Sequence, residues 1–129
     1  MAICEQMEAP SAAVKLVRRE VTRIVTPGTT MNASLLRSHE NNFLGAVMPD
    51  PSSPERSGFA YVDVTTGEYR ATELDLAEVA AALETLNVRE VLAPAGTTHK
   101  FACLKTDVEP WVFAADYAAR SLCDHFHLL

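Results

Sequence analysis

Cysteine and histidine side chains gather near the end of the chain, where they could hold a metal ion. Cys123 and His127 are four residues apart and would share one face of a helix, whereas His125 would point elsewhere. A structural zinc site needs four ligands. The other two cysteines, Cys4 and Cys103, are far away in the sequence. We therefore expect no metal site, but a buried thiol beside a surface imidazole, as in a protein of a reducing cytoplasm.

Phosphate-binding chemistry is also absent from the sequence patterns. None of the five glycines directly precedes the Lys-Ser or Lys-Thr pair of a nucleotide-binding loop. Three clustered cations, Arg18, Arg19 and Arg23, are the candidates for contact with DNA phosphates. In a strand, Arg19 and Arg23 would share a face, although a solvated strand face is the simpler interpretation. The sequence thus predicts no catalytic residue and no cofactor site.

Charge divides the chain into two unequal parts. Residues 1–27 hold four basic and three acidic side chains, a net charge of +1, whereas residues 28–129 hold seven basic and 14 acidic ones, a net charge of −7. Binding to a nucleic-acid backbone requires cations that displace counterions, so the larger part should bind DNA poorly by itself. The composition, 48% hydrophobic and 22% charged, is that of a globular protein, and no stretch reaches the roughly 20 apolar residues of a membrane span.

Two strand-like segments come first. Residues 2–4 resemble the end of a strand, and residues 16–25 alternate β-branched and charged side chains, which predicts a strand with Val17, Val21 and either Ile24 or Val25 facing a core. Periodicity alone also allows a short helix at residues 16–25.

A boundary follows at Thr26, Pro27, Gly28 and Thr29. Pro27 lacks a backbone donor and Gly28 permits a positive φ, and the charge balance changes sign here. We place an interdomain junction at these residues, with domains at 1–27 and 28–129.

The second part alternates strands and helices. The patterns predict a helical turn at 32–38, strands at 42–48, 59–64, 69–74, 91–92 and 111–113, a loop at 95–105, and helices at 76–86 and from Asp116 to the chain end. Asp75 and Glu78 form a capping-box pattern before the first helix. Ala118, Leu122, Phe126 and Leu129 form one apolar stripe on the second.

This order predicts an α/β fold with a mixed β-sheet flanked by helices, and the ribonuclease-H-like arrangement is the nearest architecture. Enzymes of that fold hold two metal ions between carboxylates, which come from the first strand and from neighbouring elements. The first strand here has no acid, and Asp63, Glu68, Asp107 and Asp116 are more simply interpreted as turn, cap or exposed residues. A metal-dependent nuclease stays open as the alternative, as does a free-standing protein-interaction module.

Several longer stretches resemble the MutS family of DNA mismatch repair proteins. Residues 2–8 (AICEQME) and 16–29 (LVRREVTRIVTPGT) are similar to the end of its mismatch-binding domain. Residues 42–47 (NFLGAV), 58–74 (GFAYVDVTTGEYRATEL) and 90–94 (EVLAP) are similar to the connector domain that follows. The family usually has Glu-Asp-Pro where this chain has Glu8-Ala9-Pro10, and it has a glycine that is missing before Leu16.

The resemblance implies a remnant of the mismatch-binding domain at 1–27 and a connector domain at 28–129, truncated at its C-terminal end. The family's Phe-Xaa-Glu mismatch wedge lies upstream and its ATPase site downstream, so ATP and Mg²⁺ belong to the parent protein and no catalytic residue can be transferred to this chain. Implied partners are the rest of MutS, a second MutS subunit, MutL and mismatched duplex DNA, with no membrane, in the bacterial cytoplasm at the nucleoid. The implied role is to link the mismatch-binding and ATPase regions and to offer MutL a docking surface.

Overall fold

The computed structural model describes residues 2–7, 18–29, 41–53 and 55–128. The helical turn expected at 32–38, and Leu16, Val17 and Leu129, lie outside the described residues. In chain order the elements are β1 (Ala2–Gln6), β2 (Arg19–Ile24), the 3-10 helix η1 (Pro27–Thr29), β3 (Phe43–Pro49), β4 (Arg56–Asp63), β5 (Tyr69–Asp75), α1 (Leu76–Thr85), β6 (Glu90–Pro94), β7 (Leu104–Val108), the 3-10 helix η2 (Pro110–Phe113) and α2 (Ala115–Phe126).

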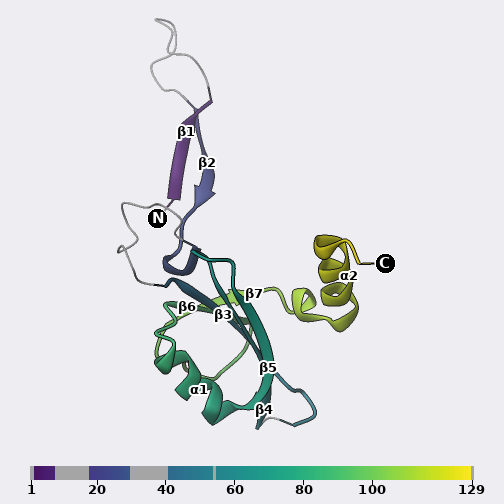
Figure 1. The fold of residues 1–129 in the computed structure, drawn as a ribbon. Coiled ribbons are helices and arrows are strands. Elements are labelled where there is room, and N and C mark those ends of the chain that lie inside the picture. The colour runs from purple at the N-terminus through teal and green to yellow at the C-terminus, as the bar shows by residue number, and fades with distance from the viewer. Residues whose placement is uncertain (1, 8–17, 30–40, 54, 129) are drawn as a thin grey trace, which may run out of the picture.

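Five strands form one mixed sheet in the order β5-β4-β3-β6-β7 (Figure 1). β3 pairs antiparallel with β4, and β4 with β5, whereas β6 runs parallel to both β3 and β7. The first three strands form antiparallel hairpins because their connections are short, and the crossover through α1 makes the later pairs parallel. This topology confirms the mixed α/β fold and the ribonuclease-H-like strand order predicted from the sequence.

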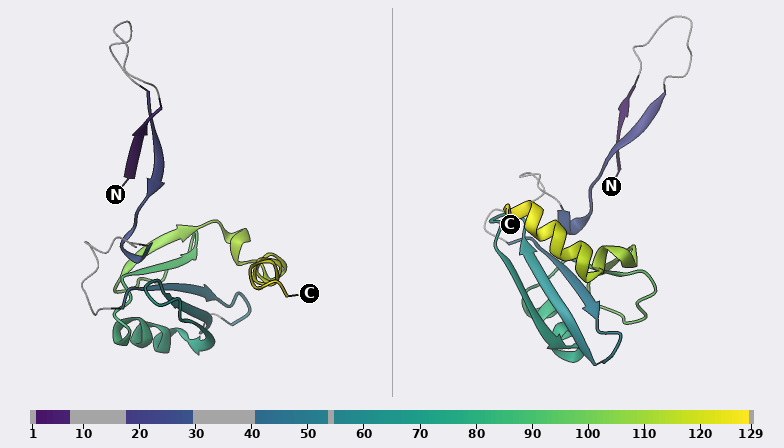
Figure 2. Two further views of the ribbon diagram at one scale, coloured as in Figure 1. Left: turned by 45° about the horizontal axis from the view of Figure 1, so that its top comes forward. Right: turned by 90° about the vertical axis from the view of Figure 1, so that its right-hand side faces the viewer.

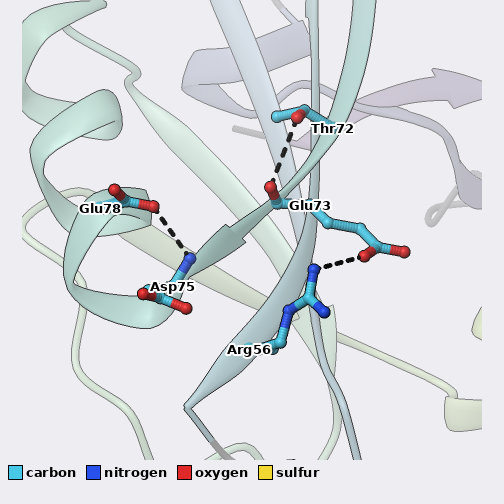
Figure 3. A network of polar contacts seen from close by, with 5 residues as sticks. All are labelled: Arg56, Thr72, Glu73, Asp75 and Glu78. Atoms are coloured by element: carbon cyan, nitrogen blue, oxygen red, sulfur yellow. Dashed lines mark hydrogen bonds and ion pairs between the residues drawn. The ribbon is translucent and has the colours of Figure 1, made fainter.

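Helix α1 covers one face of the sheet and closes the hydrophobic core. Val79 and Leu83 of the helix are buried against Val47, Phe59 and Val91 of the strands. The capping box is present at the start of the helix. Figure 3 shows its second half, in which the backbone N–H of Asp75 donates to Oε2 of Glu78 over 3.2 Å, near an ion pair that links β4 to β5. The helix predicted at 76–86 is therefore confirmed, and Val79 and Leu83 lie on its buried face.

The segment after β6 differs from the prediction. Residues 104 and 105, expected at the end of the loop at 95–105, instead begin the edge strand β7, whose Lys105 and Asp107 pair with each other at 2.9 Å. Residues 111–113, expected as a strand, belong to η2, because Pro110 starts a helical turn in which Trp111 stays 58% exposed.

Helix α2 lies on the side of the sheet away from α1 (Figure 2). Its N-cap is Ala114, so the prediction that Asp116 caps the helix is wrong, and Asp116 lies in the first turn instead. Leu122 and Phe126 of the predicted stripe are 46% and 56% exposed.

Strands β1 and β2 form a separate antiparallel ribbon that projects from the sheet (Figure 1). The strand interpretation of the second segment is confirmed from Arg19 onward, and no helix forms there. The expectation that Val21 faces a core is wrong, because it is 57% exposed. Of the two alternatives at the end of the segment, Ile24 is 69% exposed and Val25 is half-buried. Every residue of both strands is exposed, since no element in the described part of the chain covers this ribbon.

Candidate functional site

The predicted junction is a compact turn that leads from the ribbon into the sheet. Thr26 and Thr29 close it, with their hydroxyl oxygens 2.7 Å apart and the N–H of Thr29 donating to the carbonyl of Thr26 over 3.2 Å. Pro27 begins η1, and Gly28 in its centre is buried. This turn lies against β3 and β6. The four junction residues are thus brought together, and they attach the ribbon to the sheet.

Glu90 binds this turn from the first position of β6. Its side chain is almost completely buried, at 1% exposed. Oε2 accepts a hydrogen bond of 2.9 Å from the backbone N–H of Gly28, and Oε1 accepts one of 2.8 Å from the hydroxyl of Thr106 on β7. Hydrogen bonds to a charged acceptor are about twice as strong as neutral ones, and buried ones cannot be replaced by water. Glu90 therefore joins the junction to two strands.

Gly28 is required by close approach and not by its φ. The glycines with positive φ in the described part of the chain are Gly67 and Gly96, so Gly28 does not use the positive φ that a glycine permits. A Cβ atom at Gly28 would lie 2.8 Å from Cβ of Glu90 and 2.8 Å from Cδ1 of Leu44. Only a residue without a side chain allows η1 to lie this close to β3 and β6.

Asn42 holds the same turn from the residue before β3. Its Nδ2 donates to the carbonyl of Pro27 over 3.3 Å, and it is 2% exposed. The backbone N–H of Asn42 donates to Oδ1 of Asp63 at the end of β4, over 3.3 Å. Asp63 also accepts bonds from the N–H and the hydroxyl of Thr65, at 2.9 and 2.6 Å. A continuous set of buried polar groups therefore runs from the junction to the β4–β5 turn.

The environment of Asp63 favours its ionised form. Burial by itself would raise the pKa of this carboxyl, but hydrogen bonds from Thr65, the Asn42 backbone and Thr66 outweigh it and hold the pKa below its usual value. Near the other end of the set, burial raises the pKa of the Cys103 thiol, and the charge of Glu90 adds to the rise.

The geometry of these carboxylates does not suit metal binding. Asp63 and Glu90 each accept hydrogen bonds from protein donors, and among the described residues no group of three or more His, Cys, Asp and Glu side chains is placed to hold a metal ion. Cys123 and His127 do not form such a group, and His127 ends α2 with a left-handed φ of 53°.

The candidate DNA-contact arginines are all on the surface of the ribbon. Arg18 forms an ion pair with Glu20. A register shift in the ribbon places Arg19 opposite Gln6 but Arg23 opposite Ile3, which belong to opposite faces of β1. The prediction that Arg19 and Arg23 share a face is therefore wrong, since the bulge breaks the two-residue alternation. Contact with DNA stays a prediction for all three.

Sequence reasoning placed a turn at residues 26–29, which the structure confirms as η1, but it missed the residues that hold this turn. Glu90, Asn42, Asp63 and Thr106 were assigned no part in it. The available signal was a charged or polar residue at the edge of an otherwise apolar strand, as in Glu90 before Val91. That signal does not name a partner, because Gly28 is 62 residues away.

Comparison with known proteins matches two successive segments of the chain. A model of MutS domain II matches residues 42–128, and one of MutS domain I matches residues 1–34. Curated proteins named DNA mismatch repair protein MutS are similar over nearly all of the chain. The relative from Solibacter usitatus is 51% identical over 100% of the chain, that from Chlorobaculum tepidum 38% over 98%, and that from Salinibacter ruber 34% over 98%. The chain spans only 15–16% of the length of these relatives.

The structure is a mixed sheet joined by a turn to a projecting ribbon, and a MutS family model matches each of these two parts. Together they define a two-part segment of a DNA mismatch repair protein. The chain belongs to the MutS family. The matched parts are domains I and II, which lack the ATPase domain. No helix in the part that the structure describes is long and apolar enough to cross a membrane.

Proposed function

We propose that this chain is the non-catalytic link of a MutS-type mismatch repair protein, joining the mismatch-binding domain, at residues 1–27, to a connector domain, at residues 28–129. In that role it transmits movement between the DNA-bound and ATP-bound regions. The observation that carries the proposal is that β2 runs through Val25 and Thr26 directly into η1, which the buried 2.9 Å hydrogen bond from Gly28 to Glu90 holds against the sheet. A rigid connection of this kind passes a rotation of one part on to the other.

The charge distribution supports a role that depends on the rest of the protein. The body from residue 28 onward carries a net charge of −7, which opposes binding to a phosphate backbone. The arginines of the ribbon supply the nearest cations, and we propose that Arg18, Arg19 and Arg23 contact DNA only when the remaining protein holds the duplex near them.

The partners follow from the same proposal. The parent protein would bind mismatched DNA, ATP and Mg²⁺, pair with a second subunit, and recruit MutL through a surface of the connector, in the bacterial cytoplasm at the nucleoid. Helix α2 offers exposed apolar side chains, Trp111 before it and Leu122 and Phe126 on it, which suit such a protein contact.

Two preparations test the proposal. The purified chain is assayed with Mg²⁺, ATP and mismatched duplex, and a chimaera carries this chain in place of the matching region of the Solibacter usitatus relative. We expect no cleavage, no ATP hydrolysis and weak DNA binding by the chain alone, but repair activity in the chimaera. Cleavage of duplex by the chain alone would instead support the nuclease alternative, and a folded chimaera without repair activity would contradict the linking role.

A further inference from the structure

The β1–β2 ribbon has few points at which its direction can be fixed. All residues of both strands are exposed, and the ribbon meets the sheet at η1 (Figure 1). Within the described part of the chain, the direction of the ribbon therefore depends on how firmly η1 is held against β3 and β6.

Glu90 is placed to hold η1 against the sheet. It is the first residue of β6, which is paired on both sides, to β3 and to β7. Its backbone is therefore fixed, and the bond from Thr106 to Oε1 restricts the carboxylate itself. The other oxygen, Oε2, then faces the N–H of Gly28. The carbonyls of this turn are engaged separately, by Asn42.

We infer that Glu90 is a positioning residue that fixes the direction of the ribbon relative to the sheet. Within the proposed linking function, on which this inference rests, it is the residue through which movement of β6 reaches the mismatch-binding side. Loss of its acceptor oxygens would leave the fold of the sheet in place and free η1, and the ribbon with it, to move relative to the sheet.

Two substitutions separate the hydrogen bond from the bulk of the side chain. Glu90→Leu fills much of the same space but accepts no hydrogen bond, and it leaves the Gly28 N–H without its acceptor. Glu90→Gln keeps one acceptor oxygen for Gly28, and its amide group can donate to Thr106, because a hydroxyl can rotate to accept. We expect the glutamine variant to behave like the unsubstituted chain.

The readout is the distance between two spin labels, one on the exposed Cys4 of β1 and one introduced by Thr72→Cys on the exposed edge of β5. Cys103 and Cys123 are replaced by alanine in every sample, so that only the two sites carry a label. We expect a single narrow distance peak in the labelled chain that keeps Glu90 and in Glu90→Gln, and loss of that peak in Glu90→Leu. Circular dichroism on the same samples reports whether the sheet is folded.

A folded Glu90→Leu variant that keeps the narrow peak would overturn the inference. If that variant does not fold, Gly28→Ala opens the same contact from the other side, and a folded Gly28→Ala variant with the narrow peak would overturn it equally. The repair assay of the chimaera judges the linking function separately. If Glu90→Leu loses the narrow peak but the chimaera carrying the same substitution repairs DNA as well as before, the linking function is contradicted and the positioning role of Glu90 remains.

Discussion

Replacing Gly28 with alanine should destabilise the protein by an amount that the geometry of the junction sets. The new Cβ would lie 2.8 Å from Cβ of Glu90 and from Cδ1 of Leu44, whereas carbon atoms normally approach to about 3.5–4.0 Å. Cβ of Glu90 is anchored to β6, so η1 must move outward by roughly 1 Å. That movement also stretches the bond between the Gly28 N–H and Glu90, now 2.9 Å.

Two costs arise from this one displacement. Forcing extra volume into a close-packed site costs about 1–3 kcal/mol, and weakening a buried hydrogen bond to a charged group costs about 1.5–3 kcal/mol. Because the same movement relieves the first and causes the second, they do not add fully, and we expect a loss of about 2–4 kcal/mol in the free energy of unfolding.

Gly58→Ala is the matched control. A Cβ at Gly58 has its nearest neighbour, the carbonyl oxygen of Met48, at 3.8 Å, which is an ordinary contact. Both substitutions restrict the unfolded chain to the same extent, so that effect cancels in the comparison. Urea unfolding of both variants, followed by circular dichroism at pH 7, gives the difference. Two variants of equal stability, within about 0.5 kcal/mol, would refute the close-packed junction.

Three further outcomes are expected. Because hydrogen bonds hold the folded pKa of Asp63 below its unfolded value, its stabilising contribution is complete above about pH 4 and is lost as the pH falls through the folded pKa. Asp63→Asn should therefore be less stable at pH 7, and its stability should fall less steeply as the pH is lowered through the acid range. An acid range with the same slope as in the unsubstituted chain would count against this. Burial and the charge of Glu90 raise the pKa of the Cys103 thiol, so at pH 8 a thiol reagent should modify the exposed Cys4 first, as measured by mass spectrometry. Faster reaction of Cys103 than of Cys4 would contradict the environment described for Cys103. Glu78→Ala removes one half of the capping box and should cost about 0.5–2 kcal/mol in urea unfolding, whereas an unaffected midpoint would show that the box contributes nothing.

The sequence predicts those elements whose signals are local. Helix α1 follows from apolar residues at helical spacing behind Asp75 and Glu78. Strands β4 and β5 follow from the two alternating segments at 59–64 and 69–74, on either side of a turn in which Gly67 has a φ of 78°. Both were predicted because the residues that decide the structure are close together in the chain.

The elements that were missed depend on contacts between distant residues. Strand β7 carries Lys105 and Asp107 among its five residues and is a strand because β6 pairs with it. The apolar residues after Pro110 have a strand-like composition, but the proline starts a 3-10 turn. The bulge opposite Ile3 and Cys4 places Arg19 and Arg23 on opposite faces of the ribbon, and no local sequence pattern predicted it.

The junction combines both cases. Pro27 and Gly28 announce a turn, so its position could be predicted. The reason for the glycine could not, because the atoms that exclude a side chain belong to Leu44 and Glu90 on two other strands.

Amide hydrogen exchange at Gly28 tests the central claim most directly, because that single N–H reports whether the junction is closed around Glu90. In the unsubstituted chain at neutral pH, we expect protection comparable with that of Val91 on β6, and about 10- to 100-fold faster exchange after Glu90→Leu. Exchange of the Gly28 amide at the rate of an unprotected peptide, while Val91 remains protected, would contradict the claim.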